Sequence, residues 1–351
     1  MSRVTLGDVA VERRESCKGD KSRYPVVGLE HLTPEEITLT AWDEAGENTF
    51  TKIFYKGDVL FGRRRAYLKK AALAPFEGIC SGDITVIKAK SDYILHELLP
   101  FVIQNDNFFD FAVGKSAGSL SPRVKWEHLK EYEFTLPSLK KQESISKILW
   151  SVNDTIEAYK KLTALTDELV KAKFIEMFGT IDSVGRFSRK QWKDVVQIIN
   201  GKDHKKVLNP NGLYPIYGSG GIMGRADDYL CPEYTIVIGR KGTIDKPFFV
   251  TEKFWNVDTA FGIIPNESIL HYLYLFWYCK QLNFGKLNKA STLPSTTKTD
   301  LLELWINVPS YEQQEQFADF VQQSEKSKSE IERAITTAKA MMKRIIAENL
   351  G

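Results

Sequence analysis

Hydrophobic and polar positions follow two different patterns in alternating stretches of this chain. Short runs rich in aromatic and β-branched residues, interrupted by Gly and Pro, occur at residues 53–55, 59–61, 84–87, 235–238 and 260–264. Runs of this kind are typical of short strands in a mixed α+β domain. Residues 272–279 form the longest apolar stretch and predict a buried segment, because a membrane helix needs about 20 such residues.

Two long segments without Pro or Gly, residues 142–178 and 313–350, predict long helices. About 36 helical residues span roughly 54 Å, which is too long for a small domain to bury the apolar stripe. We therefore expect the helices to pack on each other as an antiparallel, coiled-coil-like pair. The alternative is that each helix packs on its own domain. The residues expected in the helix pair are Ile145, Leu149, Val152, Ile156, Leu165, Leu169, Ile331, Ile335, Ala338, Met342 and Ile345.

The chain carries an internal repeat of about half its length. Leu136-Pro137-Ser138 followed by Gln142-Glu143 recurs 172 residues later as Val308-Pro309-Ser310 followed by Gln314-Glu315. Three more pairs occur in the same order: Tyr24-Pro25-Val26 with Tyr214-Pro215-Ile216, Phe61-Gly62-Arg63-Arg64 with Ile238-Gly239-Arg240-Lys241, and Ser116-Ala117-Gly118-Ser119-Leu120 with Lys289-Ala290-Ser291-Thr292-Leu293. Repeats in a constant order indicate two copies of one unit. The predicted fold is α+β, with two similar β-rich mixed domains at residues 1–141 and 180–310, long helices at 142–179 and 311–351, and an approximate two-fold axis.

Composition narrows the class of protein. The 351 residues are 43% hydrophobic, enough for more than one core, and residues 1–16 lack an apolar segment of signal-peptide length, so we expect a cytoplasmic protein. The four cysteines and five histidines are scattered. Neither a metal site nor a disulfide framework is predicted.

Basic residues cluster although 48 Lys and Arg nearly balance 45 Asp and Glu. Residues 52–70 contain seven Lys or Arg and one acid, a composition that suits a polyanion. Two similar domains held at a fixed spacing by helices suit DNA, because half-site separation then follows from protein geometry. The residues predicted to bind DNA are Arg63, Arg64, Arg65, Lys69, Lys115, Ser116, Ser119, Ser121 and Arg123 in the first copy, and Arg240, Lys241, Thr243, Lys289, Ser291, Thr292, Ser295, Thr296 and Lys298 in the second.

The paired Pro-Ser junctions into long helices resemble those of type I restriction-modification specificity subunits over essentially the whole chain. Further motifs that carry the resemblance are Tyr217-Gly218-Ser219-Gly220-Gly221-Ile222, Ile238-Gly239-Arg240-Lys241-Gly242-Thr243 and Trp255-Asn256-Val257-Asp258-Thr259-Ala260-Phe261. The polar residues 324–328 depart from the apolar pattern of the second helix.

The resemblance implies a non-catalytic subunit of a DNA methylation and restriction assembly. Each domain would be a target recognition domain that reads half of a bipartite, asymmetric sequence in double-stranded DNA. Two methyltransferase subunits would bind this chain and transfer methyl groups from S-adenosylmethionine to adenine N6, and ATP- and Mg-dependent restriction subunits join some such complexes. This chain would hold no cofactor and no metal.

Two other classes of function compete with DNA reading. Gly114-Lys115-Ser116 resembles the end of a phosphate-binding loop, but Phe109 stands where that loop needs its first Gly. Residues 218–224 resemble a nucleotide loop, yet Pro215 and Tyr217 precede them in place of an apolar strand. An enzyme is therefore disfavoured. A helical adaptor or scaffold that never binds nucleic acid remains the alternative function.

Overall fold

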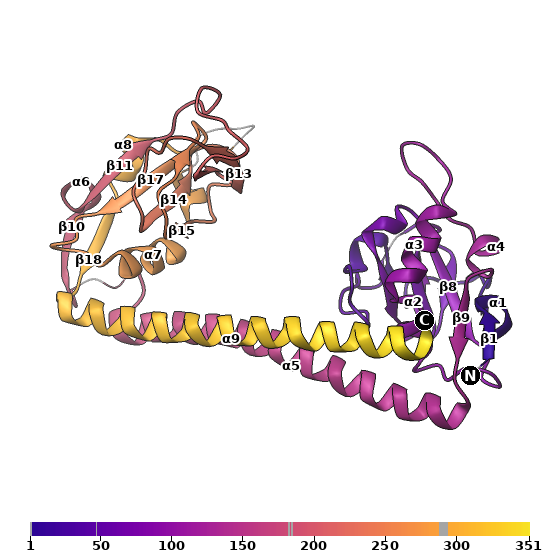
Figure 1. The fold of residues 1–351 in the computed structure, drawn as a ribbon. Helices are drawn as coiled ribbons and strands as arrows, with labels where there is room; N and C mark the ends of the chain where they lie inside the picture. Colours follow the sequence, from indigo (N-terminus) through magenta and orange to yellow (C-terminus); the bar gives the residue numbers. More distant parts are fainter. Residues whose placement is uncertain (1, 47, 182, 184, 288–293) are drawn as a thin grey trace. The chain divides into compact units, whose positions relative to one another are not determined.

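The structure is a computed structural model that describes residues 2–46, 48–181, 183, 185–287 and 294–351. Two compact units make up the chain: unit 1 is Met1–Lys161 with Glu332–Gly351, and unit 2 is Leu162–Ile331. Two long helices, α5 (Leu139–Phe178) and α9 (Tyr311–Leu350), each contribute one part to unit 1 and one part to unit 2 (Figure 1).

Unit 1 is built around three small sheets. Its four-stranded antiparallel sheet has the order β2-β8-β5-β6, and a three-stranded sheet has the order β3-β7-β4. β1 pairs with β9 as a separate ribbon. The strands and helices are β1 (Ser2–Thr5), α1 (Leu6–Val9), β2 (Ala10–Glu12), β3 (Val26–Val27), η1 (Leu29–His31), β4 (Lys52–Phe54), β5 (Val59–Gly62), η2 (Ala66–Leu68), β6 (Ala71–Leu73), β7 (Gly78–Cys80), β8 (Ile84–Ala89), α2 (Leu99–Ile103), α3 (Asp106–Gly114), α4 (Trp126–Leu129) and β9 (Glu133–Leu136).

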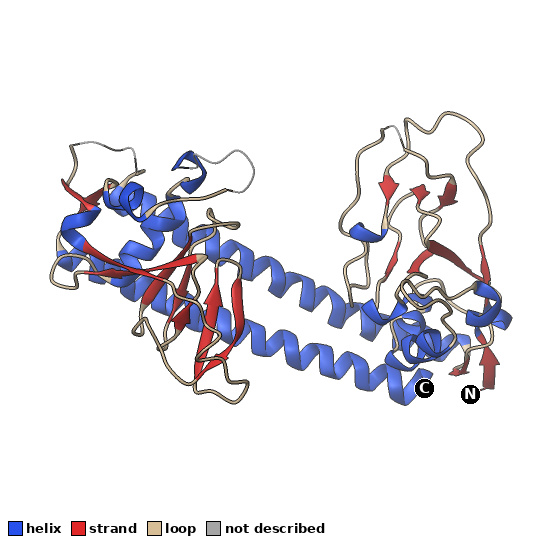
Figure 2. Cartoon of the chain, turned by 90° about the horizontal axis from the view of Figure 1, so that it is seen from above, coloured by secondary structure: helices blue, strands red, loops and turns tan. Residues whose placement is uncertain are grey.

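Unit 2 repeats this plan. Its strands are drawn in red in Figure 2. The four-stranded sheet has the order β11-β17-β14-β15, the three-stranded sheet the order β13-β12-β16, and β10 pairs with β18. The elements are β10 (Ser188–Gln191), α6 (Trp192–Val195), β11 (Val196–Asn200), β12 (Tyr214–Gly218), β13 (Gly221–Ala226), β14 (Thr235–Gly239), β15 (Phe248–Val250), β16 (Trp255–Asn256), β17 (Ala260–Pro265), α7 (Tyr272–Gln281), η3 (Phe284–Leu287), α8 (Lys298–Leu302) and β18 (Trp305–Val308).

Strand registers confirm the repeat that the sequence predicts. Gly62 pairs with Ile84 at the end of β5, and Gly239 pairs with Ala260 at the end of β14. The parallel pairs β3–β7 and β12–β16 begin from the repeated Tyr-Pro motifs. The two three-stranded sheets differ in where their third strand pairs. In unit 1 the third strand, β4, pairs with β7, whereas in unit 2 the third strand, β13, pairs with β12. The five strands expected at residues 53–87 and 235–264 are confirmed, and residues 272–279 lie in the mostly buried helix α7.

A buried glutamine joins each long helix to the domain that precedes it. Gln142 Nε2 donates to Tyr93 O and Pro137 O, both at 3.0 Å, and its Oε1 accepts from Leu95 N at 3.0 Å. In unit 2, Gln314 makes the matching three bonds, with Nε2 donating to Ile269 O at 3.0 Å and Pro309 O at 3.1 Å, and Oε1 accepting from His271 N at 2.8 Å. The exposed fractions of the two side chains are 1% and 0%. The repeated Pro-Ser…Gln motif therefore encodes one hydrogen-bonded junction used twice.

In unit 1 the apolar stripes of both helices join the domain core. Ile145, Leu149 and Ile156 of α5 share a core cluster with Met342, Ile346 and Leu350 of α9. Val152, Ile335, Ala338 and Ile345 pack against the same cluster and are partly buried. Phe101 of α2 contacts Trp150 with ring centroids 5.2 Å apart, so α5 also packs on its own domain. Both long helices therefore contribute side chains to the core of unit 1.

In unit 2 a different stripe of α5 is buried from the one that the sequence predicts. Leu165 and Leu169 are 48% and 56% exposed, so their assignment to helix packing was wrong. Val170, Phe174 and Phe178 are buried instead, with the Phe174 ring 5.4 Å from that of Phe317 in α9. Two apolar stripes run along this part of α5, and the spacing alone favoured the leucines. Ile331 is half-buried.

The polar residues 324–328 of α9 pack by an ion pair in place of apolar contact. Lys328 Nζ lies 2.8 Å from Asp167 of α5 and 2.7 Å from Glu325. Ser324 is buried and donates to the carbonyl oxygen of Phe320 at 2.9 Å. Lys328 stands at the position that Ile156 occupies in unit 1, 172 residues earlier, so helix contact continues through this stretch with a salt bridge. Within the part of the chain that the structure describes, no helix is both long and apolar enough to cross a membrane.

Candidate nucleic-acid interface

In unit 1 the chain leaves strand β5 into a loop that three backbone hydrogen bonds fix. Arg63 N donates to Asp83 O at 3.0 Å, and Val124 N donates to Arg63 O at 3.0 Å. Arg65 N donates to Pro122 O at 2.8 Å. We call residues 63–65 the unit 1 strand-end loop. It lies between the segment before β8 and the segment before α4, which brings together residues that are about 60 apart in the sequence.

The same three bonds build the unit 2 strand-end loop, residues 240–242. Arg240 N donates to Thr259 O at 2.8 Å, Thr296 N donates to Arg240 O at 3.0 Å, and Gly242 N donates to Pro294 O at 3.0 Å. The Gly-Arg motifs that sequence comparison paired therefore occupy equivalent backbone positions.

Backbone angles at the third residue of each strand-end loop also agree. Gly242 has φ of +81° and Arg65 has φ of +55°, both in the left-handed region. Glycine adopts this region freely, whereas a residue with a Cβ pays about 1–2 kcal/mol. Unit 1 thus carries an exposed arginine at a position where the backbone favours glycine. Strain of this kind is concentrated at functional sites.

Arginines outnumber acids around the unit 1 strand-end loop. Arg123 Nε donates to Asp83 at 2.8 Å, and Arg64 Nη1 lies 3.6 Å from the same carboxylate. The hydrogen bond from Arg123 holds the pKa of Asp83 below its usual value, so Asp83 is charged at neutral pH. Arg64 Nε donates to Ser121 Oγ at 2.5 Å. Together with Arg63 and Arg65 these arginines carry more charge than the one aspartate neutralises, which suits phosphate binding.

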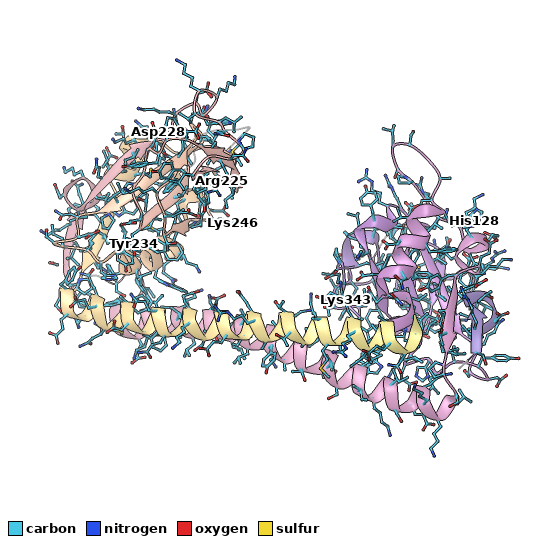
Figure 3. All side chains as sticks on the ribbon, in the orientation of Figure 1. His128, Arg225, Asp228, Tyr234, Lys246 and Lys343 are labelled. Carbon is cyan, nitrogen blue, oxygen red and sulfur yellow. The ribbon has the colours of Figure 1, made fainter. Side chains whose placement is uncertain are left out.

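Arg63 also borders an open cavity of about 530 Å³. Its other lining residues are Glu12, Arg14, Lys125, Trp126, Glu127 and His128, the last on α4 (Figure 3). Arg63 Nε is buried and has no hydrogen-bond partner among the described residues. Buried polar atoms are normally hydrogen-bonded, so this nitrogen is an exception among the described residues.

In unit 2 five of the predicted residues line one cavity of about 320 Å³: Arg240, Lys241, Ser295, Thr296 and Lys298, together with Asn200, Phe261 and Thr297. Lys241 is exposed and Arg240 half-buried. Thr296 Oγ1 donates to Gly239 O at 3.1 Å, and Lys298 Nζ donates to Ile198 O at 2.8 Å. These two side chains hold the cavity wall in place. Thr243 follows the strand-end loop and is half-buried.

Most of the remaining predicted residues lie away from the strand-end loops or outside the described part of the chain, whereas Ser121 contacts Arg64 of the unit 1 strand-end loop. Lys69 Nζ lies 2.5 Å from Asp106, which also contacts Lys343 of α9 at 3.1 Å. Lys115 lies 3.3 Å from Glu131, and Ser116 Oγ donates to Ala112 O. Ser119 and Ser121 lie on the hairpin of residues 117–123. Lys289, Ser291 and Thr292 lie outside the described residues.

Sequence reasoning missed the groups that position the arginines. The sequence pairs Asp83 with Asp258 as isolated acids at similar places in the two copies, which favours a structural role for both. Trp126 and Asn200 carried no motif. The internal repeat was the sequence feature that could have located these groups, since residues 122–124 and 294–296 bond to the strand-end loops at equivalent positions. An alignment of the two halves by Pro122 and Pro294 would have found these segments.

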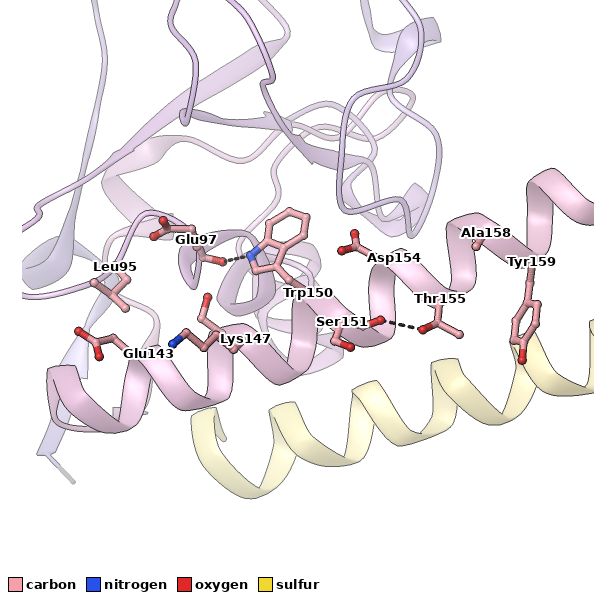
Figure 4. A pocket seen from close by; sticks show the side chains of 11 residues that line it. Leu95, Glu97, Glu143, Lys147, Trp150, Ser151, Asp154, Thr155, Ala158 and Tyr159 are labelled. Atoms are coloured by element: carbon pink, nitrogen blue, oxygen red, sulfur yellow. Dashed lines mark hydrogen bonds between the residues drawn. The ribbon is translucent and has the colours of Figure 1, made fainter.

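A cavity of about 870 Å³ lies elsewhere in unit 1, along one face of α5 (Figure 4). Trp150 Nε1 donates to Glu97 O at 2.9 Å on its wall, and Thr155 Oγ1 donates to Ser151 O. Its charged lining residues are Glu97, Glu143, Asp154 and Lys147, three acids to one base. This balance disfavours nucleic acid, so the strand-end loops are the better candidates.

Two units of one topology, each with a fixed basic strand-end loop, define a protein with paired recognition domains. A family model described as the type I restriction modification DNA specificity domain matches residues 2–166 and 187–338. The chain therefore belongs to this family. Both halves of the chain match, in agreement with the two units.

Known proteins agree with this assignment. The EcoDI specificity subunit of a type I restriction enzyme from Escherichia coli is 28% identical over an alignment of 160 residues. The alignment covers 41% of this chain and 35% of that relative. A solved S subunit of a type I restriction-modification system from M. genitalium has a TM-score of 0.59 at 12% identity, over 100% of this chain and 96% of that chain. A chain from a structural study of type I R-M complex assembly has a TM-score of 0.54 at 19% identity, covering 99% and 97%. These two similarities support the fold.

Proposed function

We propose that this chain is the sequence-specific DNA-binding subunit of a type I restriction-modification complex. One observation carries the proposal: both units build a basic strand-end loop with the same three backbone hydrogen bonds. A rigid backbone that presents arginines can donate to phosphates and, through guanidinium groups, to guanine. Residues 1–141 and 180–310 serve as the two target recognition domains.

The two half-sites differ in sequence because the two loops present different side chains. Arg65 stands at the position of Gly242, and Arg123 at that of Ser295. A guanidinium group in unit 1 therefore corresponds to a backbone or hydroxyl group at the equivalent position of unit 2. Two identical recognition domains would read a palindrome, whereas these two domains favour an asymmetric bipartite target in double-stranded DNA.

The helices α5 and α9 form an antiparallel, pseudo-two-fold pair that sets the spacer between the half-sites. Support comes from positions 172 residues apart, which have the same role in each unit. Ile145 and Leu149 share a core with Ile346 and Leu350 in unit 1. Phe317 and Val321 share a core with Phe174 and Phe178 in unit 2.

Methyltransferase subunits bind to the helices, and they supply the chemistry. Leu162, Leu165 and Leu169 of α5 are 46–56% exposed and lie on one helical face, a surface that suits a partner helix. The partners carry S-adenosylmethionine and methylate adenine N6, and restriction subunits with ATP and Mg join where they exist. This chain is a non-catalytic, cytoplasmic subunit that holds no cofactor.

The modular proposal is tested by exchange of residues 1–141 for the matching region of a relative with a different target. We expect methylated adenines to map to a target that is changed in one half and unchanged in the other. A change in both halves would rule out independent recognition domains.

A helical adaptor that never contacts nucleic acid is the competing function. Binding by phosphate contacts makes affinity fall steeply with salt, with a log–log slope of about −0.9 for each phosphate neutralised. Affinity of the methylase-bound complex for DNA should therefore be measured between low and physiological salt. A flat profile would favour the adaptor.

A further inference from the structure

A short hairpin between α3 and α4 carries an exposed leucine at its tip. Ala117 N donates to Arg123 O at 3.0 Å, and Arg123 N donates to Ala117 O at 2.9 Å. Gly118, with φ of +111°, allows the chain to turn. Leu120 is 92% exposed, and Figure 1 shows the segment between α3 and α4 as a loop that stands away from the rest of unit 1.

The base of this hairpin is tied to the unit 1 strand-end loop on its returning arm. Pro122 O accepts from Arg65 N at 2.8 Å, and Ser121 Oγ accepts from Arg64 Nε at 2.5 Å. Arg123 is held by Asp83 at 2.8 Å. Leu120 therefore projects from a fixed base beside three arginines. Little conformational entropy is lost when such a side chain becomes buried in a partner.

We propose that Leu120 inserts between two stacked base pairs of the half-site that unit 1 binds. The inference rests on the proposed DNA-binding function and assigns to it a residue that distorts the duplex. The arginines at the base of the hairpin attract phosphates of the DNA. Near those phosphates, the faces of the stacked bases are the large apolar surfaces that a duplex offers to a leucine. Proteins that bend DNA insert apolar wedges, leucine among them, between base steps and unstack them.

The insertion makes Leu120 a specificity determinant without a hydrogen bond to any base. Pyrimidine–purine steps unstack at lowest cost, so a wedge selects them at its point of entry. The half-site read by unit 1 should contain such a step at a fixed position. Replacement of that step by a purine–pyrimidine step should weaken binding in the presence of Leu120 only.

The test uses the methylase-bound complex without S-adenosylmethionine and compares wild type with Leu120→Ala, Arg65→Ala and Leu139→Ala. Leu139 is 44% exposed at the first turn of α5 and serves as the matched leucine control. We expect Leu120→Ala to lower DNA affinity about tenfold, as loss of a buried leucine predicts, with the salt slope unchanged. Arg65→Ala should reduce the slope by about 1. Leu139→Ala should match wild type.

Unstacking is read directly from the permanganate reactivity of thymines in the half-site. A reactive thymine with wild type that is protected with Leu120→Ala supports the wedge. Unchanged affinity and reactivity in Leu120→Ala would overturn it. A loss of affinity that disappears when uracil replaces thymine would overturn it in favour of a groove contact to a methyl group. A complex of wild type that shows no sequence preference refutes DNA reading itself, which separates the two failures.

Discussion

Loss of the buried glutamine amide at either helix junction should destabilise the unit that contains it. Gln314→Met keeps a side chain of similar length and removes both polar groups. The carbonyl oxygens of Ile269 and Pro309 and the amide of His271 then lose their partners, at distances of 2.8–3.1 Å in the native structure. Gln142→Met makes the same change in unit 1.

The magnitude follows from three hydrogen bonds. A typical bond contributes about 1 kcal/mol net, and a buried group left without a partner costs about 1–3 kcal/mol. The bond from Gln314 to Pro309 is buried and the other two are partly buried, so water replaces part of the loss. We expect the free energy of unfolding to fall by roughly 2–4 kcal/mol, or about 5–15 °C in the melting temperature of a domain of this size.

The assay must distinguish the two units, because one melting curve of a two-unit chain is not a two-state measurement. Hydrogen exchange followed by mass spectrometry provides this resolution. Gln314→Met should speed exchange in β14 and β17, and Gln142→Met should speed it in β5 and β8. Gln316→Met is the matched control, since Gln316 lies two residues further along α9 and is exposed.

The reasoning about the junction would be refuted by a loss under about 1 kcal/mol in both variants, well short of what three bonds predict. It would also fail if the control variant destabilised the protein equally. Faster exchange in the opposite unit would show that the glutamine acts on something other than its own junction.

Three further outcomes are expected. Arg63→Ala or Arg240→Ala should weaken DNA binding of the methylase-bound complex by about 1–3 kcal/mol if the arginine reads a base, and unchanged affinity and target preference would remove that residue from the interface. A fragment of residues 1–178 should dimerise and read a palindrome, because residues 170–178 of a second copy can replace residues 342–350; light scattering that finds only monomer, without DNA recognition beside the partner, would contradict this. Burial raises the pKa of Cys80 to about 12, so it remains a protonated thiol at pH 8, and maleimide should label Cys17 before Cys80 in the folded protein, as peptide mass spectrometry can check.

The repeat made the fold predictable from one sequence. Gly62 and Gly239 end equivalent strands, and each could be found because the chain carries its own second copy as a comparison. The Pro-Ser…Gln motifs likewise marked both helix starts. What the motif did not reveal was the role of Gln142, since a glutamine near a helix start is more often in solvent than buried with three bonds.

Side-chain direction was the part that sequence could not supply. Lys298 and Thr296 are typical phosphate-binding residue types, yet both bond to carbonyl oxygens of neighbouring strands. Leu165 and Leu169 have helical spacing, but the choice between two apolar stripes of α5 depends on the aromatic residues that α7 and α9 present to Phe174. Such choices depend on tertiary packing, which local periodicity does not encode.

Unit 1 is discontinuous in the chain, and this affects the order of its folding. Leu350 has no exposed surface, and it belongs to the same core cluster as Leu6 and Leu149. During translation, the face of α5 that includes Leu149 therefore remains incompletely buried until the ribosome has made all of unit 2. Premature termination within α9 would leave that face uncovered, so a chaperone or protease could sense whether synthesis of the second unit had been completed.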